Sequence, residues 1–268
     1  MRALPGRLVL LGHPVAHSLS PRFQNAALRA AEIPLVYETI DVAPDALRAT
    51  LAELALVGAS GNVTIPHKEA VAARCQRLST IAERCGAVNT FWHEEGQLVG
   101  DNTDVGGVDA IASLLLGAAR SSATVALLGA GGSAAAVVAA VERWGDARVR
   151  VYNRNVDRAR ALAARFGAVV EVVDSVEQAL DGAALVVNAT PVGLKDDALP
   201  VPVRRLPAGA AVFDLVYRAN ETAWVRAARE AGHRAADGEG MLVEQGALSF
   251  ERWFGIEPDR GAMWRALH

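Results

Sequence analysis

The second half of the chain alternates apolar runs of strand length with helical stretches, and this alternation constrains the fold more than any other feature. Strands are expected at Thr124–Leu128, Arg148–Tyr152, Val169–Val173, Leu185–Asn188 and Ala211–Leu215. Helices are expected between the first three of them, at Ser133–Arg143 and Val156–Phe166. Apolar strands joined by helices form a parallel sheet that is covered on both faces.

The first part of the chain also mixes strands and helices, with less regularity. Strands are expected at Leu8–Leu11, Leu35–Val42 and Gly61–Pro66, and a hairpin from Ala87–His93 and Gln97–Asn102. One helix is expected to open at Ser20-Pro21, with Ser20 as its N-cap and Pro21 in its first turn. Further helices are expected at Ala43–Leu54, from His67 onward, and at the C-terminal end, at Met241–Trp253 and Pro258–Leu267.

Composition places the chain among globular proteins with ample apolar material. Of its 268 residues, 51% are hydrophobic and 21% are charged, and the net charge is -3. No run of basic residues indicates binding to nucleic acid. Two cysteines, Cys75 and Cys85, have neither metal spacing nor a disulfide framework, and the apolar run Leu8–Leu11 is too short for a signal peptide or a membrane span. We therefore expect a cytoplasmic protein.

A glycine-rich turn follows the strand Thr124–Leu128. The segment Gly129-Ala130-Gly131-Gly132-Ser133-Ala134 leads from that strand into an alanine-rich helix, which is the context of a dinucleotide-binding turn. Gly129 allows a tight turn, Gly131 lets a pyrophosphate approach the backbone, and the helix N-terminus offers N–H groups to phosphate. The alternative is a turn that binds nothing. The predicted cofactor residues of this turn are Gly129, Ala130, Gly131, Gly132 and Ser133.

The end of the next strand indicates which dinucleotide is bound. An NAD site has a carboxylate there for the ribose 2′-hydroxyl, whereas this strand ends in Asn153-Arg154-Asn155, with Arg158 one turn later. Guanidinium groups suit a 2′-phosphate in shape and charge. Asn153, Arg154 and Arg158 therefore predict NADP. The alternative is a solvated arginine pair, and Asp157 could pair with either arginine.

Four further segments complete a pattern that is spread over the chain. They are Gly12–Pro21 (GHPVAHSLSP), Asn62–Lys68 (NVTIPHK), Gly100–Asp104 (GDNTD) and Gly240–Gly246 (GMLVEQG). Together with the glycine-rich turn, and in this order, they resemble the shikimate dehydrogenase family. Asn153-Arg154 matches the family's NADP motif. The segment Asn188–Gly193 (NATPVG) resembles the family's loop over the cofactor, which implies that Thr190 lies near the phosphates or the nicotinamide.

The resemblance implies an α/β fold of two domains. Residues 1–105 would form a substrate-binding and catalytic domain, completed by the returning helices of residues 238–268. Residues 106–237 would form a Rossmann-like NADP-binding domain. The implied activity is the NADP-dependent, reversible reduction of 3-dehydroshikimate to shikimate in aromatic amino-acid biosynthesis. The implied partners are these small molecules, with no nucleic acid and no membrane. The resemblance is also compatible with a homodimer.

The predicted substrate residues are polar side chains in the matching segments. In the family, the two serines equivalent to Ser18 and Ser20 bind the substrate carboxylate, although Ser20 could serve only as a helix cap. Thr64 and Asn89 would bind hydroxyl groups, Gln245 would contribute from the returning helix, and Tyr217 would reach the carboxylate.

Lys68 and Asp104 are the predicted catalytic pair. Lys68 opens a helix, so it lies against the helix dipole, a location that favours a lowered amine pKa. A nearby carboxylate such as Asp104 would orient the ammonium, and the pair would relay a proton while the cofactor carries the hydride. The alternative is a structural ion pair. His17 and His67 are expected to be structural, and no histidine pair has metal spacing, so no metal is expected.

Several positions depart from the family's usual residues. Gln24 stands where a histidine is common, His13 where asparagine is common, and Val105 where glycine is frequent. These departures leave room for a quinate/shikimate or an aminoshikimate dehydrogenase. A ligand-binding regulator without catalysis is a further alternative, and the presence of both Lys68 and Asp104 argues against it.

Overall fold

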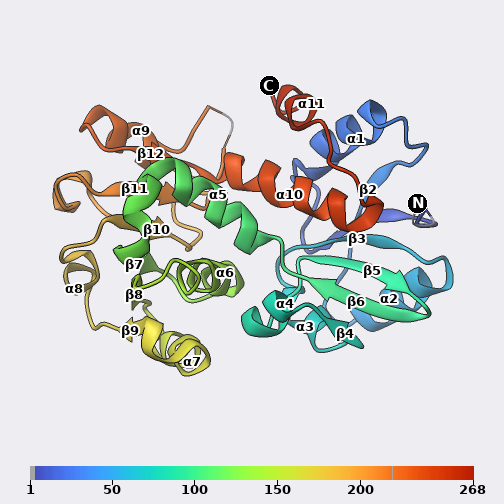
Figure 1. The fold of residues 1–268 in the computed structure, drawn as a ribbon, viewed down its shortest axis with the longest axis horizontal. Coiled ribbons are helices and arrows are strands. Elements are labelled where there is room, and N and C mark those ends of the chain that lie inside the picture. Colours follow the sequence, from blue (N-terminus) through green and yellow to red (C-terminus); the bar gives the residue numbers. More distant parts are fainter. Residues whose placement is uncertain (1–3, 219) are drawn as a thin grey trace. The chain divides into compact units, whose positions relative to one another are not determined.

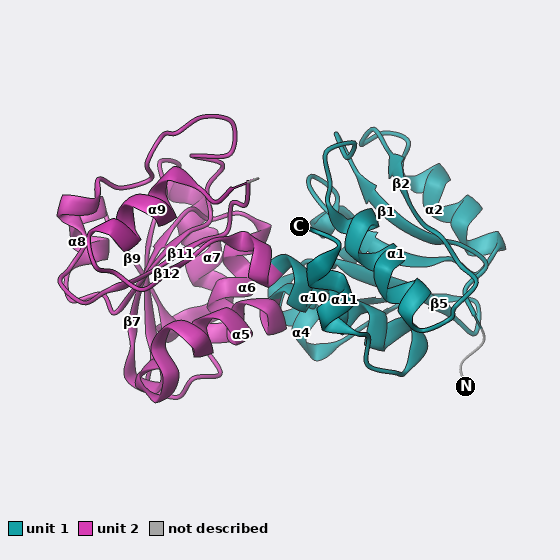
Figure 2. Cartoon of the chain, turned by 90° about the horizontal axis from the view of Figure 1, so that it is seen from above, with its two compact units in different colours: residues 1–104, 242–268 teal, residues 105–241 magenta. Residues whose placement is uncertain are grey.

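The computed structural model describes residues 4–218 and 220–268 and divides the chain into two compact units (Figure 2). Unit 1 comprises Met1–Asp104 and Leu242–His268, and unit 2 comprises Val105–Met241. Each unit is built around a six-stranded sheet. The predicted α/β fold class, with C-terminal helices that return to the first unit, is confirmed.

The sheet of unit 2 is parallel throughout, with strand order β12-β11-β10-β7-β8-β9. Its strands are β7 (Thr124–Leu128), β8 (Arg148–Tyr152), β9 (Val170–Val172), β10 (Leu185–Asn188), β11 (Ala211–Asp214) and β12 (Ala235–Ala236). Every residue of β10 and β11 is buried. The expected parallel sheet is therefore present.

Helices cover this sheet. They are α5 (Asp104–Leu116), α6 (Gly132–Val141), α7 (Val156–Phe166), α8 (Val176–Leu180) and α9 (Ala223–Glu230). Short 3₁₀ turns lie at Gly117–Ser122, Gly167–Val169 and Val203–Arg205. α7 begins where Asn155 Oδ1 accepts from the N–H groups of Asp157 (3.0 Å) and Arg158 (3.3 Å), as an N-cap should. The helices predicted from the sequence did not include α5, α8 or α9.

The sheet of unit 1 is mixed, in the order β2-β1-β3-β5-β6-β4. Its strands are β1 (Leu8–Gly12), β2 (Tyr37–Asp41), β3 (Ser60–Val63), β4 (Arg77–Leu78), β5 (Thr90–Glu94) and β6 (Gln97–Asp101). β5 runs antiparallel to both β3 and β6, so the hairpin predicted for this segment is confirmed.

The helices of unit 1 pack on both faces of its sheet. They are α1 (Ser20–Ala30), α2 (Leu47–Leu56), α3 (Lys68–Ala72), α4 (Thr80–Cys85), α10 (Gly238–Phe254) and α11 (Arg260–Arg265). Successive residues of a strand face opposite sides. Leu8 and Leu10 pack with residues of α1, α10 and α11, whereas Val9 and Leu11 pack with residues of α2 and α3. The last helix, α11, lies beside α1 (Figure 1).

Candidate active site

Lys68 and Asp104 form an ion pair in unit 1. Lys68 is the first residue of α3, and Asp104 is the first residue of α5. The lysine Nζ lies 2.5 Å from Asp104 Oδ2, and 14% of the lysine side chain and 6% of the aspartate side chain are exposed. Attraction between two charges is stronger at such a position than in water. Because α3 is a single turn, its dipole is small, and Asp104 is the charge that acts most directly on the ammonium.

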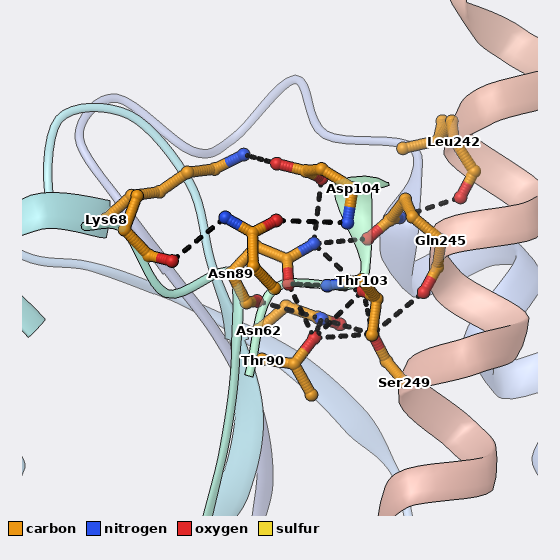
Figure 3. A network of polar contacts seen from close by, with 11 residues as sticks. Asn62, Lys68, Asn89, Thr90, Thr103, Asp104, Leu242, Gln245 and Ser249 are labelled. Atoms are coloured by element: carbon orange, nitrogen blue, oxygen red, sulfur yellow. Dashed lines mark hydrogen bonds and ion pairs between the residues drawn. The ribbon is translucent and has the colours of Figure 1, made fainter. Parts of the chain in front are cut away.

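Asn89 fixes the other oxygen of the Asp104 carboxylate (Figure 3). Asn89 Oδ1 accepts a hydrogen bond from the backbone N–H of Thr103 at 2.8 Å. A backbone N–H can only donate, so Asn89 Nδ2 must point the other way, and it donates to Asp104 Oδ1 at 2.8 Å. The two carboxylate oxygens therefore have different donors, and the carboxylate is held in one orientation.

A buried polar network surrounds Asn89. Ser249 of α10 is fully buried, and its Oγ lies 2.7 Å from Thr90 Oγ1 and 3.0 Å from Thr103 Oγ1. It also accepts from Asn62 Nδ2 at 2.9 Å. Figure 3 shows these side chains converging from β3, β5, α10 and the segment before α5. Every polar group in such a buried network needs a partner, so the network holds its members in place.

The sequence reading assigned neither Asn62 nor Ser249 to the site. Asn62 is oriented by Tyr37, whose hydroxyl donates to Asn62 Oδ1 at 2.8 Å. Burial raises the pKa of Tyr37 well above its ordinary value, so this hydroxyl stays a donor. The available signal for Ser249 was its position four residues after Gln245, on the same face of a helix.

Ser18 and Ser20 lie at the start of α1. The prediction that Ser20 is the N-cap is wrong, because the helix begins at Ser20 and the N-cap position is taken by Leu19, which makes no side-chain cap. Ser18 Oγ accepts the N–H of Ser20 at 3.2 Å, a local bond that serine commonly makes in turns. Within the described residues, no group bonds to the Ser20 hydroxyl, which leaves it available to a ligand.

Thr64, Gln245 and Tyr217 are the remaining predicted substrate residues. Thr64 follows β3, beside Gly12, where a Cβ would lie 2.5 Å from Thr64 Cγ2. Gln245 Oε1 lies 3.2 Å from Asn89 Nδ2, so Gln245 belongs to the Asn89 network. Tyr217 follows β11 in unit 2, whereas the others lie in unit 1.

α10 approaches α1 closely at Gly246. A Cβ there would lie 2.3 Å from the Phe23 ring, and Gln24 Nε2 donates to the Gly246 carbonyl at 2.9 Å. Only glycine permits this approach. The position of the adjacent Gln245 therefore depends on the absence of a side chain at residue 246.

In unit 2, the glycine-rich turn joins β7 to α6. Gly129 has a φ of +110°, and a Cβ there would lie 2.8 Å from the Ala189 carbonyl oxygen. A Cβ at Gly131 or Gly132 would meet no atom of the described residues within 4 Å. The backbone at the start of α6 therefore borders open space, and its N–H groups suit a phosphate. Ala130 and Ser133 lie within the same turn.

The end of β8 lies at the same edge of the sheet as this turn, because Leu128 of β7 pairs with Tyr152 of β8. Asn153 follows Tyr152 directly, and its Nδ2 donates to the Asn155 carbonyl at 2.7 Å. The segment that was predicted to recognise the 2′-phosphate is thus next to the segment that was predicted to bind the pyrophosphate.

Arg154 and Arg158 are both exposed, and the described residues give neither of them an ion-pair partner. Asp157, which could have neutralised one of them, instead pairs with Arg160 at 3.5 Å. Guanidinium groups with free donors suit the oxygens of a phosphate group. The residues present at this edge therefore fit NADP.

Thr190 lies in the loop after β10, also at this edge, because Leu128 pairs with Asn188. The Thr190 N–H and hydroxyl both donate to Asn188 Oδ1, at 3.0 and 2.6 Å. Asn188 Nδ2 in turn donates to Asp214 Oδ1 at 2.8 Å. Asp214 is fully buried, and this burial raises the pKa of its carboxyl group.

None of the described helices combines the length and the apolar character needed to cross a membrane. The described histidine, cysteine, aspartate and glutamate side chains form no group that could hold a metal ion.

Three family models match the chain. The substrate-binding domain of shikimate dehydrogenase matches residues 10–91. The shikimate/quinate 5-dehydrogenase model matches residues 111–193. The C-terminal domain of shikimate 5′-dehydrogenase matches residues 238–268.

Similar proteins share nearly the whole length of the chain. The shikimate dehydrogenase (NADP(+)) of Rubrobacter xylanophilus is 45% identical over 267 residues, covering 96% of this chain and 94% of the relative. The shikimate 5-dehydrogenase of Thermus thermophilus, solved in complex with NADP(H) and shikimate, is 41% identical with a TM-score of 0.87, and each chain is 97% covered. Quinate dehydrogenase from Corynebacterium glutamicum in complex with NAD is 31% identical with a TM-score of 0.89, again with 97% of each chain covered. The predicted resemblance is confirmed, and the chain belongs to the shikimate dehydrogenase family.

Proposed function

We propose that this protein catalyses the reversible, NADP-dependent reduction of 3-dehydroshikimate to shikimate, a step of aromatic amino-acid biosynthesis. The observation that carries the proposal is the Lys68–Asp104 pair, largely buried and with 2.5 Å between Nζ and Oδ2. Reduction of a ketone needs a proton at its oxygen, and a positioned acid–base group can supply it. The hydride is the chemistry that NADPH supplies when bound.

Lys68 donates the proton in this proposal. Its ammonium gives one N–H to Asp104, and within the described residues Nζ has no other partner, so two N–H groups remain for a substrate. The chain has only two lysines, Lys68 and Lys195, and uses arginine at its other basic positions. A guanidinium does not release a proton near neutral pH, whereas an ammonium can. An arginine would serve a structural ion pair equally well, so the lysine at position 68 favours a role in proton transfer.

Asp104 holds the ammonium in place and stabilises its charge. When the reaction runs toward the ketone, the amine of Lys68 accepts the proton of the reacting hydroxyl, and Asp104 stabilises the ammonium that forms. Asn89 prevents the carboxylate from rotating away, because it occupies the oxygen that Lys68 does not contact.

The substrate is bound by polar groups around this pair. The hydroxyl groups of Ser18 and Ser20 bind the carboxylate, and Tyr217 is a further proposed substrate residue. Thr64 and Gln245 bind hydroxyl groups. Asn89 is the remaining residue predicted to bind a hydroxyl group. It has the least capacity left to donate to a ligand, because its Nδ2 has two hydrogens and already has three acceptors within 3.2 Å.

The cofactor residues of the proposal lie in unit 2. The turn of Gly129, Ala130, Gly131, Gly132 and Ser133 binds the pyrophosphate. Asn153, Arg154 and Arg158 bind the 2′-phosphate. Thr190, in the loop after β10, is a further residue that binds the cofactor. The relative from Thermus thermophilus, which was solved with NADP(H) and shikimate, supports both ligands.

An absorbance assay at the nicotinamide band tests the proposal, with shikimate, quinate and an amino analogue of shikimate each offered with NADP and with NAD. We expect the highest kcat/KM for shikimate with NADP. A higher value for quinate, or for an amino analogue of shikimate, would assign the chain to the alternative dehydrogenases. Binding of shikimate without any turnover would indicate a regulator. The Lys195→Ala variant is the matched control for Lys68→Ala, because Lys195 is the other lysine and is exposed.

A cytoplasmic location is also proposed, on the cysteine content, and a homodimeric state, on the family resemblance. Sedimentation velocity over a range of protein concentrations tests the second point. A single species with the mass of one chain at every concentration would contradict it.

A further inference from the structure

Building on the proposed NADP dependence, we infer that Asp214 is a positioning residue that acts through Asn188 on the Thr190 hydroxyl. Asp214 fixes this hydroxyl as a hydrogen-bond acceptor toward the cofactor. Thr190 consequently binds an N–H or O–H donor on the nicotinamide half of NADP, and it does not bind a phosphate. All of these residues lie in unit 2.

A backbone donor sets the direction of the first two hydrogen bonds. The N–H of Val216 lies 3.1 Å from Asp214 Oδ1 and can only donate, so this oxygen accepts. Asn188 lies 2.8 Å from the same oxygen, so it presents its Nδ2 there. Its Oδ1 consequently faces the loop after β10 as an acceptor.

The orientation of the Asn188 amide decides where the Thr190 hydrogen points. Thr190 Oγ1 lies 2.6 Å from Asn188 Oδ1, and two oxygens this close need a hydrogen between them. The single hydroxyl hydrogen is thus already used. Val192 N donates to Thr190 Oγ1 at 3.3 Å, which leaves one lone pair. Phosphate oxygens of the cofactor offer only lone pairs at neutral pH, whereas a carboxamide N–H or a ribose O–H can donate to this oxygen.

This polarity does not depend on the charge of Asp214. Burial raises the pKa of its carboxyl group, and the hydroxyl of Thr222 lies 2.9 Å from Asp214 Oδ2. A proton on the carboxyl group would sit on Oδ2, because Oδ1 already faces two donors. Asp214 Oδ1 therefore accepts from Val216 and Asn188 whether the group is ionised or neutral.

The order of the strands indicates which half of the dinucleotide reaches Thr190. β7 lies between β8 and β10, and Leu128 pairs with both Tyr152 and Asn188, so the three strands end level with one another. Dinucleotides lie across such an edge, with the pyrophosphate at the glycine-rich turn. With the 2′-phosphate at the end of β8 and the pyrophosphate at the end of β7, the nicotinamide half lies over the end of β10.

Calorimetric titration of two ligands tests the role of Thr190. NADP contains the nicotinamide half, whereas 2′-phospho-ADP keeps the adenosine, the 2′-phosphate and both phosphates of the pyrophosphate and lacks the nicotinamide riboside. We expect Thr190→Val to weaken NADP about tenfold, the order of one lost hydrogen bond, and to change 2′-phospho-ADP less than twofold. Thr190→Ser, which keeps the hydroxyl, should restore NADP binding.

Equal weakening of both ligands in Thr190→Val would place the hydroxyl on a phosphate and overturn the inference, and so would an unchanged NADP affinity. If the wild-type protein binds neither ligand, the proposed NADP dependence itself is wrong. The two kinds of failure are therefore distinguishable.

Variants of Asp214 test its part directly. Asp214→Asn keeps an oxygen for Val216 and Asn188, so NADP affinity should stay within threefold of wild type. Asp214→Leu removes that oxygen and should weaken NADP about as much as Thr190→Val, while the double variant should be no weaker than Asp214→Leu alone. Additive losses, or normal NADP binding in Asp214→Leu, would contradict the role of Asp214.

The control for lost stability is Val212→Ala, a fully buried core change in the same strand. It should lower Tm and leave NADP affinity unchanged. Should Asp214→Leu not fold, Asn188→Leu replaces it. This variant breaks the same connection one residue nearer to Thr190, and the same result is expected.

Discussion

Asn89 Nδ2 donates to Asp104 Oδ1 at 2.8 Å, on the oxygen that Lys68 does not contact. A hydrogen bond to a charged group contributes about 1.5–3 kcal/mol. The orientation of the Asp104 carboxylate thus depends on the amide group of a neighbouring side chain.

Asn89→Ala is therefore expected to lower kcat roughly 10- to 100-fold, the rate equivalent of that hydrogen bond. KM for NADP should change little, because Asn89 lies in unit 1 and the proposed cofactor residues lie in unit 2. Steady-state kinetics over a range of pH measures both. An unchanged kcat would mean that Lys68 alone holds Asp104 in place.

Lys68→Ala is expected to lose about 10²–10⁴-fold in kcat, the usual contribution of a general acid–base group. NADP binding, measured by calorimetry, should be retained. Lys195→Ala should match wild type in both measurements. A loss of less than tenfold in Lys68→Ala would reduce this residue to a structural role.

The Lys68→Ala/Asp104→Asn double variant tests whether the pair acts as a unit. Because each residue needs the other, the double variant should be scarcely slower than the slower single variant. Rates measured under identical, saturating conditions decide this. Multiplied losses would show two independent contributions.

Arg154→Ala is expected to weaken NADP at least tenfold more than NAD, a difference of about 1.4 kcal/mol. The physical reason is the loss of a guanidinium that has no competing ion pair in the described structure. Arg160→Ala is the matched control, because Arg160 is exposed and pairs with Asp157. This variant should leave the ratio of NADP affinity to NAD affinity unchanged. Equal weakening of both cofactors would remove Arg154 from 2′-phosphate recognition.

Asp237 makes stability depend on pH. Burial, together with the charges of Glu239, Glu221 and Asp214, raises the pKa of its carboxyl group to about 6, against the lowering effect of the hydrogen bond from the Glu239 N–H. The unfolded chain has an aspartate pKa of about 3.9, so the folded state binds the proton more tightly. The resulting stabilisation is complete below about pH 4 and is lost as the pH rises through about 6.

Asp237→Asn should remove this dependence. The asparagine still offers an oxygen to the Glu239 N–H, which lies 3.1 Å from Asp237 Oδ1, and it carries no charge. At pH 7.5, Tm should rise by about 2–4 °C for each kcal/mol recovered. At pH 4 the variant and wild type should melt together. Scanning calorimetry at both pH values checks this, and a variant less stable at pH 7.5 would refute it.

Much of unit 2 could be predicted from the sequence, because its elements are locally determined. β7, β8, β10 and α7 have the predicted bounds. The strands are apolar runs buried in a parallel sheet, and α7 lies between the capping Asn155 and Gly167, which has a φ of +62°. Cap residues of this kind favour the local backbone conformation that they adopt, so the ends of such elements can be predicted from the sequence.

Other parts depend on contacts that no local pattern reveals. α5 contains Gly106 and Gly107 in its first turn, which lowers its helix propensity, and it is stabilised by the burial of side chains such as Val108. The hydrogen bond between Asn62 and Ser249 joins residues 187 positions apart. The motif around Asn62 was visible in the sequence, but its partner on the last long helix was not.

The position of Gln245 and Ser249 near the C-terminus has a consequence for synthesis. A ribosome makes the chain from its N-terminus, and domains fold as they emerge. All of unit 2 is therefore made before the residues that complete the network around Asn89. Until the final helices emerge, Thr103 and Asn89 are without their partners on α10, so a nascent chain can hold a finished unit 2, with the proposed nucleotide site, well before it holds a finished network around Asn89.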